Sequence, residues 1–140
     1  MLSKNLLTGL EQKVIHKITE ESWLELAADL IRCGQPASGN ALDPDLPSGE
    51  EEAIAHMVAG ELKSMGFEVE MPTKKLGRPN VIGRIKGSNG PSLMINDHLD
   101  TYPVVEPEKW DKTNYDPFDA TLHGNQLYAR GTSDTRGNLA

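Results

Sequence analysis

Cysteine and long apolar runs are scarce in this sequence. Its 140 residues include one cysteine, Cys33, which excludes an internal disulfide and is expected to be a small buried hydrophobe in a reducing compartment. No stretch approaches the roughly 20 apolar residues of a membrane span. The N-terminus also lacks the apolar core and cleavage site of a signal peptide. These absences predict a cytoplasmic protein with no membrane partner.

Positive charge is also in short supply. Lys and Arg number 14 against 21 Asp and Glu, which gives a net charge of -7. Binding to a phosphate backbone depends on basic patches, so a nucleic-acid partner is excluded. A hydrophobic content of 37% over 140 residues is enough for one ordinary core. A single globular unit is therefore expected.

Apolar residues recur at helical spacing in two stretches. Gly34 is expected to end the first, and Ser48 with Glu51 predicts a capping box at the start of the second, which Gly66 would close. The helix dipole accounts for the acidic run 50–52 in that first turn. The expected core faces are Trp23, Leu26, Ala27, Leu30 and Ile31 in the first helix and Ile54, Met57, Val58, Leu62 and Met65 in the second.

Strand-like segments follow the second helix. "FEVEM" alternates in polarity, "NVIGRIK" comes next, and the apolar run Leu93 to Ile95 follows a "GSNG" turn. "DATLHGNQLYARG" predicts a small hairpin that turns at Gly124 and Asn125. A continuous apolar strand is typical of a sheet covered on both faces, so the pattern predicts an α/β layered sheet with helices packed on it.

The segment "INDHLD" ends the apolar run with His98 and Asp100. Ligands of open α/β sheets bind beyond the carboxyl ends of strands, and a carboxylate often orients a metal-ligating imidazole. Chance also produces His-x-Asp in polar loops. Asp134 lies in the polar, glycine-flanked stretch "ARGTSDTRG", where its carboxylate either points into a cleft or caps a following helix. Spacing alone leaves both alternatives open.

Three segments in order, "NDHLDTYPVV", "KWDKTNYDPFDATLHGNQLY" and "ARGTSDTRGNLA", resemble a known family. It is the di-zinc amidohydrolase and exopeptidase family of aminoacylase, acetylornithine deacetylase, succinyl-diaminopimelate desuccinylase, carnosinase and glutamate carboxypeptidase. The likeness extends upstream to about Trp23. It implies that residues 1–140 form the N-terminal portion of a metallohydrolase catalytic domain. The implied fold is a truncated, partial three-layer sandwich with a mainly parallel mixed sheet and helices packed on it.

The resemblance also implies a site. His98 would bind one zinc, Asp134 would bridge two zincs, and Asp100 would be the catalytic aspartate that orients or tunes the base. Nitrogen and oxygen donors suit zinc, with cobalt or manganese as substitutes. The implied substrate is a small N-acyl amino acid or peptide. For the full-length protein the resemblance leaves a homodimer open.

Some residues depart from the family pattern. Asp97 stands where glycine is usual before the histidine, Ala129 begins the usual "GRG" element, and Arg136 stands where lysine is common. The family's "W…PF" element is expected to fill the core or to shape the loop near the site. It corresponds to Trp110, Pro117 and Phe118.

The remaining histidines have plainer interpretations. His16 and His56 lie in helical patterns and are expected to be surface or partly packed groups rather than ligands, and His123 precedes a turn and is expected to be solvated.

The family's Glu-Glu pair, its later ligands, its lid and dimerisation domain and its C-terminal half have no counterpart in residues 1–140. Two hypotheses follow. The first is an N-terminal fragment of a zinc-dependent amide-bond hydrolase, N-acyl amino acid deacylase or exopeptidase, that is inactive alone. The second is a non-catalytic remnant or interaction module that keeps part of the metal site.

Overall fold

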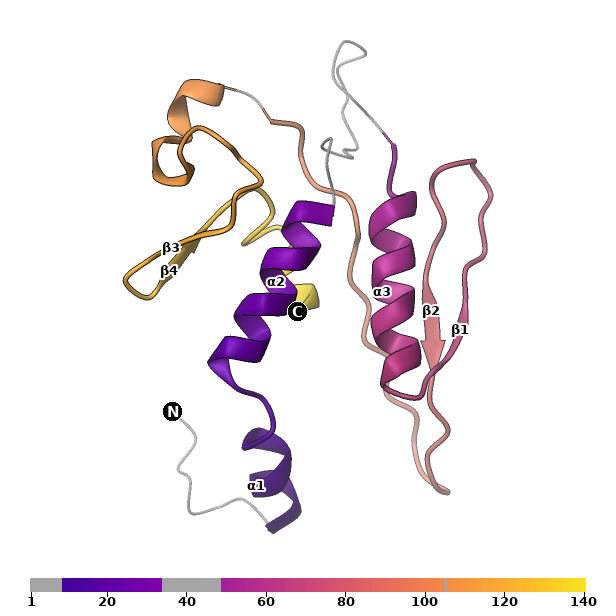
Figure 1. Cartoon of the computed structure of the whole chain (residues 1–140). Coiled ribbons are helices and arrows are strands. Elements are labelled where there is room, and N and C mark those ends of the chain that lie inside the picture. Colours follow the sequence, from indigo (N-terminus) through magenta and orange to yellow (C-terminus); the bar gives the residue numbers. More distant parts are fainter. Residues whose placement is uncertain (1–8, 34–48, 105) are drawn as a thin grey trace.

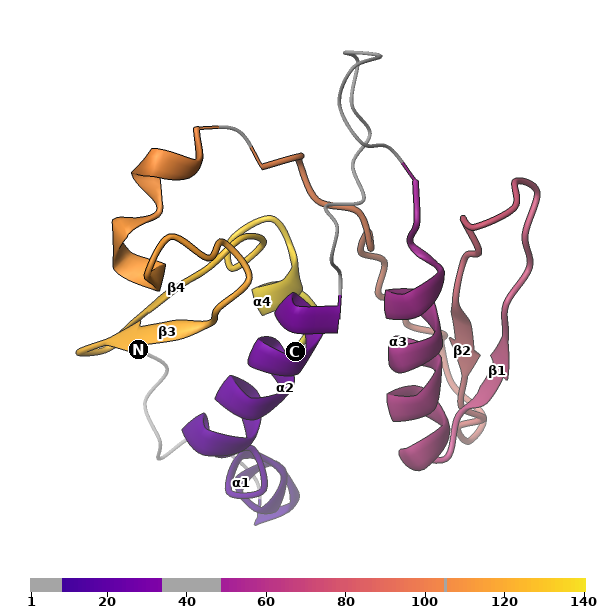
Figure 2. The same ribbon diagram turned by 45° about the horizontal axis from the view of Figure 1, so that its top comes forward.

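The protein was analysed as a computed structural model that describes residues 9–33, 49–104 and 106–140. Two helices that run antiparallel to each other lie side by side at its centre, and a short β-hairpin lies on the outer side of each (Figures 1 and 2). The helices are α1 (Gly9–Ile15), α2 (Glu20–Cys33), α3 (Glu52–Ser64) and α4 (Arg136–Leu139), with 3-10 turns η2 (Pro107–Lys109) and η3 (Asp111–Thr113). The strands are β1 (Glu68–Glu70), β2 (Ile82–Arg84), β3 (Thr121–His123) and β4 (Gln126–Tyr128). None of the described helices combines the length and apolar character of a membrane span.

Helix α2 confirms the first predicted helix and begins with a cap that the sequence reading missed. Ser22 N–H donates to Thr19 Oγ1 at 3.0 Å, and Thr19 N–H donates to Ser22 Oγ at 3.2 Å. This reciprocal pair satisfies backbone donors at the helix start. Cys33 ends α2 as a half-buried free thiol, and the predicted stop at Gly34 lies outside the described residues.

Helix α3 ends where Gly66 predicts. Gly66 has φ +89°, its N–H donates to Lys63 O at 2.9 Å, and Phe67 N–H donates to Leu62 O at 3.0 Å. These two bonds form a Schellman motif, with Phe67 and Leu62 as its apolar pair. Both side chains then meet Gly83 of β2, where an added Cβ would lie 3.0 Å from Leu62 Cδ1 and 3.2 Å from Phe67 Cδ1. Glycine thus lets the β1–β2 hairpin lie close to α3.

The start of α3 differs from the prediction. Ser48 of the expected capping box lies outside the described residues, and Glu51 stands at the N-cap without a side-chain cap bond. Glu51 is 4% exposed, and its Oε1 lies 2.8 Å from Arg78 Nη2. The predicted interaction with the helix dipole is therefore not the whole role of Glu51. The Glu51 carboxylate also ties α3 to the loop between β1 and β2 through Arg78.

The described strands do not confirm the predicted parallel sheet. β1 pairs with β2 and β3 with β4, both antiparallel, in two separate sheets. The α/β class and the hairpin at Gly124 and Asn125 are confirmed. The strand predicted over Leu93 to Ile95 is wrong: this segment has no strand partner in the described chain, and its side chains are 84–88% exposed. A strand needs a neighbour for its backbone hydrogen bonds, which apolar character alone does not supply.

The buried apolar residues come mainly from the two central helices. α2 contacts both α3 and α4, and α3 also contacts β1 and β2. This core therefore anchors α4, and with it the segment that carries Asp134. Its apolar members are Ala27, Leu30, Ile31, Ile54, Ala55, Ala59 and Ala129.

Candidate metal centre

The three residues implied as site residues lie together. His98 Nε2 is 3.1 Å from Asp134 Oδ1, and His98 Nδ1 is 3.0 Å from Asp100 Oδ1 and 3.0 Å from Asp100 O. The imidazole is thus held between two carboxylates, one on its own segment and one on the distant segment before α4. Asp134 does not act as a side-chain cap of α4, whose N-cap is Thr135.

Asp97 joins the two segments of the site. Its Oδ1 accepts hydrogen bonds from His98 N–H at 2.8 Å and from Thr135 Oγ1 at 2.7 Å. Thr135 is 4% exposed and follows Asp134 directly. The unusual carboxylate at Asp97 therefore links the backbone at His98 to the Thr135 hydroxyl of the other segment.

Arg130 adds a second connection between the same segments. Its guanidinium donates to Tyr102 O through Nε and Nη2 and to Pro103 O at 3.2 Å, and it lies 5.8 Å from the centre of the Tyr102 ring. The backbone N–H of Arg130 donates to Pro117 O at 2.6 Å. Sequence reasoning missed this role, because nothing in the spacing of Arg130 shows which carbonyls it reaches.

Opposing effects set the pKa of His98. Burial lowers the pKa, but hydrogen bonds to the backbone and side chain of Asp100 and the charges of Asp100 and Asp134 together raise it above the usual value. Both ring nitrogens face oxygen acceptors, which favours the doubly protonated imidazolium. A metal ion held by Nε2 would have to displace a proton there, and Nδ1 would keep its bonds to Asp100.

The donor set fits part of a zinc site. A metal-ligating imidazole usually gives its second ring N–H to a carboxylate, and Asp100 stands in that position behind His98. Asp134 offers an oxygen donor on the other side of the ring, and its side chain is 70% exposed. Structural or catalytic zinc takes at least three protein ligands. Within the described residues no group of three or more His, Cys, Asp or Glu could hold an ion, and His98 and Asp134 stand there as a pair.

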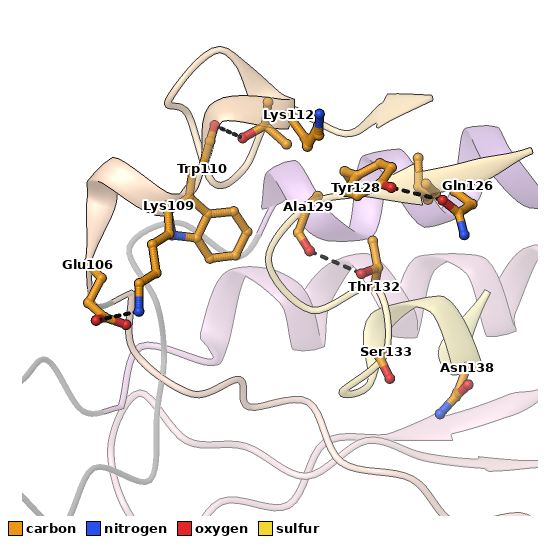
Figure 3. A pocket seen from close by; sticks show the side chains of 12 residues that line it. Glu106, Lys109, Trp110, Lys112, Gln126, Tyr128, Ala129, Thr132, Ser133 and Asn138 are labelled. Carbon is orange, nitrogen blue, oxygen red and sulfur yellow. Dashed lines mark hydrogen bonds and ion pairs between the residues drawn. The ribbon is translucent and has the colours of Figure 1, made fainter. Parts of the chain in front are cut away.

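An open cavity of about 920 Å³ adjoins the segment of Asp134 (Figure 3). Trp110 and Tyr128 give it aromatic surface, and Ser133, the residue before Asp134, lies on its wall. Trp110 is half-buried and lines this cavity, so core filling is not its whole role, whereas Pro117 and Phe118 are half-buried in the following turn. Lys109 of the wall pairs with Glu106 at 2.6 Å.

The other histidines lie on the surface, as predicted. His16 and His56 are exposed on or beside helices, and His56 Nε2 is 4.0 Å from Glu52 Oε1. His123 is exposed on β3, where its Nε2 is 2.7 Å from Lys112 O. None of the three lies with His98.

Known proteins are similar to most of this chain, although no family model matches it. It is 34% identical over 132 residues to N-formyl-4-amino-5-aminomethyl-2-methylpyrimidine deformylase of Bacillus subtilis, covering 92% of this chain and 28% of the relative. It is 36% identical over 126 residues to succinyl-diaminopimelate desuccinylase of a Methylobacterium species, covering 87% of this chain and 28% of the relative. It is 34% identical over 119 residues to acetylornithine deacetylase of Vibrio atlanticus, covering 85% of this chain and 29% of the relative. The chain thus spans less than a third of the length of these relatives.

Proposed function

Because this chain belongs to the amidohydrolase family that includes succinyl-diaminopimelate desuccinylase and acetylornithine deacetylase, we propose that it is part of a zinc-dependent hydrolase of amide bonds. We place it as the N-terminal portion of the catalytic domain, in the cytoplasm. The completed domain would carry the mainly parallel sheet with helices packed on it. The proposed substrate is a small N-acyl amino acid or peptide.

One observation carries the proposal. The imidazole of His98 lies between Asp100 and Asp134, with a separate carboxylate at each ring nitrogen. Two residues distant in the sequence are thereby brought into contact at the surface, where their charged groups remain accessible. A purely structural histidine has no need for a separate carboxylate at both ring nitrogens.

Each residue has its own proposed role. His98 Nε2 and an oxygen of Asp134 would hold zinc, with cobalt or manganese as substitutes, and Asp134 would serve both ions of a two-zinc site. Asp100 accepts the Nδ1 proton of His98, which fixes the ring orientation and the tautomer that can ligate. When bound, zinc supplies Lewis acidity that polarises a carbonyl group and makes water more acidic.

The cavity beside Ser133 is the proposed place for part of the substrate. Its aromatic surface at Trp110 suits the apolar part of an acyl amino acid, and its hydroxyl and amide groups suit the polar part.

The 140-residue chain alone is proposed to have little or no hydrolytic activity. Two ligands leave the charges of two zinc ions poorly compensated, because further donors are needed for each ion. Chelator-sensitive cleavage of N-acyl amino acids or dipeptides by the purified 140-residue chain would contradict this.

Metal stoichiometry of the full-length protein tests the proposed function. We expect close to two zinc ions per chain after dialysis, and a His98→Ala variant should lose metal and activity together. His56→Ala, an exposed helical histidine, is the matched control and should retain both. If the unaltered protein holds no metal, the alternative of a non-catalytic interaction module is supported instead.

A further inference from the structure

Arg136 is a buried charge that the proposed chemistry does not use. It is the largest side chain that the described structure buries completely, with 1% of its surface exposed. A guanidinium has no lone pair for a metal, so it cannot be a ligand. Burial of an unpaired cation is costly unless hydrogen bonds compensate for the lost water. The hydrogen-bond partners of the Arg136 guanidinium therefore indicate its structural role.

The first contact joins Arg136 to α2. Its Nη1 donates to Leu30 O at 2.6 Å. Leu30 lies in the last turn of α2, where helix carbonyls lack partners within the helix. The negative end of the helix dipole also favours a cation at this place. The end of α2 thus provides a site in which a buried guanidinium is stable.

The second contact joins Arg136 to the candidate metal centre. Its Nη2 lies 3.4 Å from Leu99 O, a long hydrogen bond. Leu99 is the residue between His98, the proposed ligand, and Asp100, which orients it. The planar guanidinium therefore connects a rigid helix end to the backbone that carries the imidazole.

Close packing fixes the stem of Arg136 as well. Gly131 has φ +89°, and an added Cβ there would lie 3.0 Å from Arg136 Cγ and 3.1 Å from Thr101 Cγ2. At the residue that follows Arg136 in the sequence, Gly137 O accepts a hydrogen bond from Trp23 Nε1 of α2 at 3.2 Å. The segment that contains Asp134 is thus held against α2 at successive points.

We propose that Arg136 is a positioning residue that sets the separation of His98 and Asp134. It does so by tying the Leu99 backbone and the start of α4 to the carboxyl end of α2. The expected effect of Arg136 on metal binding rests on the proposed function. Its effect on the separation of His98 and Asp134 is a property of the metal-free protein. Burial also lowers the pKa of Arg136, as expected for a desolvated guanidinium.

Cobalt binding by the full-length protein tests the inference, with visible Co²⁺ absorption as the readout. Arg136→Met removes both donors and should weaken Co²⁺ binding about 10- to 100-fold, the usual effect of losing a group that orients a ligand. Arg136→Lys keeps the charge but reaches one carbonyl, so its affinity should lie between. Arg84→Met, an exposed arginine of β2, is the control and should match the unaltered protein. Unchanged Co²⁺ affinity and spectrum in folded Arg136→Met would overturn the inference.

A second readout separates this inference from the proposed function. If the unaltered protein binds no Co²⁺, the proposed function fails, and the ring signals of His98 in metal-free NMR spectra decide the positioning role. Arg136→Met should then shift those signals toward their values in Asp134→Asn, and unchanged signals would overturn the inference. If Arg136→Met does not fold, Arg136→Lys decides by the same two measurements.

Discussion

The region around α3 and the candidate metal centre use buried charge in opposite ways. Beside α3, the carboxylate of Glu51 meets a side chain of opposite charge, Arg78, at 2.8 Å. Beside the candidate metal centre, the guanidinium of Arg136 meets the backbone carbonyls of Leu30 and Leu99. A side-chain pair tolerates small backbone shifts because both groups can rotate. Carbonyl partners require the backbone itself to be in place, so the candidate metal centre depends more strongly on distant parts of the chain.

The two regions also differ in how locally they are built. The end of α3 uses Gly66, Leu62 and Phe67, all neighbours in sequence, and the adjacent hairpin brings Gly83 against them. At the candidate metal centre, Asp97 accepts a hydrogen bond from Thr135, and Arg130 donates to the carbonyls of Tyr102 and Pro103. We therefore expect core changes near α3 to alter stability most, and polar changes near His98 to alter metal binding with smaller changes in stability.

The largest expected effect is on the core of α3. Ile54 is 0% exposed, and Ile54→Ala should lower the free energy of unfolding by about 2–5 kcal/mol in urea denaturation. Met65→Ala is the control, because Met65 is 57% exposed and should cost well under that amount. In Ile54→Ala the NMR signals of His98 should persist while the protein stays folded. Their loss in folded protein would show that the two regions are not separable.

A smaller effect is expected from the hydroxyl that joins the site segments. Thr135→Val keeps the shape but removes the donor to Asp97, which should cost about 1.5–3 kcal/mol because the acceptor is charged. Thr73→Val removes an exposed hydroxyl that donates to Lys75 O at 2.7 Å and should cost less. Thermal and urea unfolding measure both. Equal losses in the two variants would contradict the role given to Thr135.

Gly60, within α3, and Gly66, just past its end, should change stability in opposite directions when each is replaced by alanine. Gly66→Ala places a side chain at φ +89° and should destabilise by about 1 kcal/mol. Gly60→Ala lies within the helix, where an added Cβ meets nothing within 4 Å, and should stabilise by about 0.5–1 kcal/mol. Urea unfolding distinguishes them. Stabilisation by both would mean that the end of α3 does not need a left-handed residue.

The smallest effect concerns the pH dependence of the metal-free site. Since the pKa of His98 is raised in the folded chain, its contribution to stability is present below the unfolded value of 6.5 and is lost as pH rises through the folded pKa. The contribution is small because the His98 side chain is 52% exposed. NMR titration should show a lower pKa of His98 in Asp134→Asn than in the unaltered chain. The control Asp111→Asn should leave the pKa of His98 unchanged, and the same result for Asp134→Asn would remove Asp134 from the site.

Several elements were predictable because neighbouring residues determine them. The helical spacing from Trp23 to Ile31 predicted α2, and Gly66 predicted the end of α3. The Gly124–Asn125 turn predicted the β3–β4 hairpin. Strand pairing of Leu93 to Ile95 was not predictable from its apolar character, because pairing depends on a neighbour elsewhere in the chain.

Within the candidate site, sequence order and family resemblance pointed to His98, Asp100 and Asp134, but not to what holds them. A buried Arg136 runs against the usual exposure of charged side chains, so composition gave no sign of it. The same holds for Thr135, which lies in a polar stretch of the sequence but is 4% exposed.

By itself, the sequence determined the local elements and the identity of the groups able to carry charge or bind metal, because these follow from residue type and short-range backbone preference. Only the tertiary structure decided that His98 lies 3.1 Å from Asp134, and that Arg136 reaches α2 and Leu99 together. Those contacts join segments far apart in the chain. α2 and α4, which Arg136 joins, are themselves in contact, and no short stretch of sequence encodes that packing.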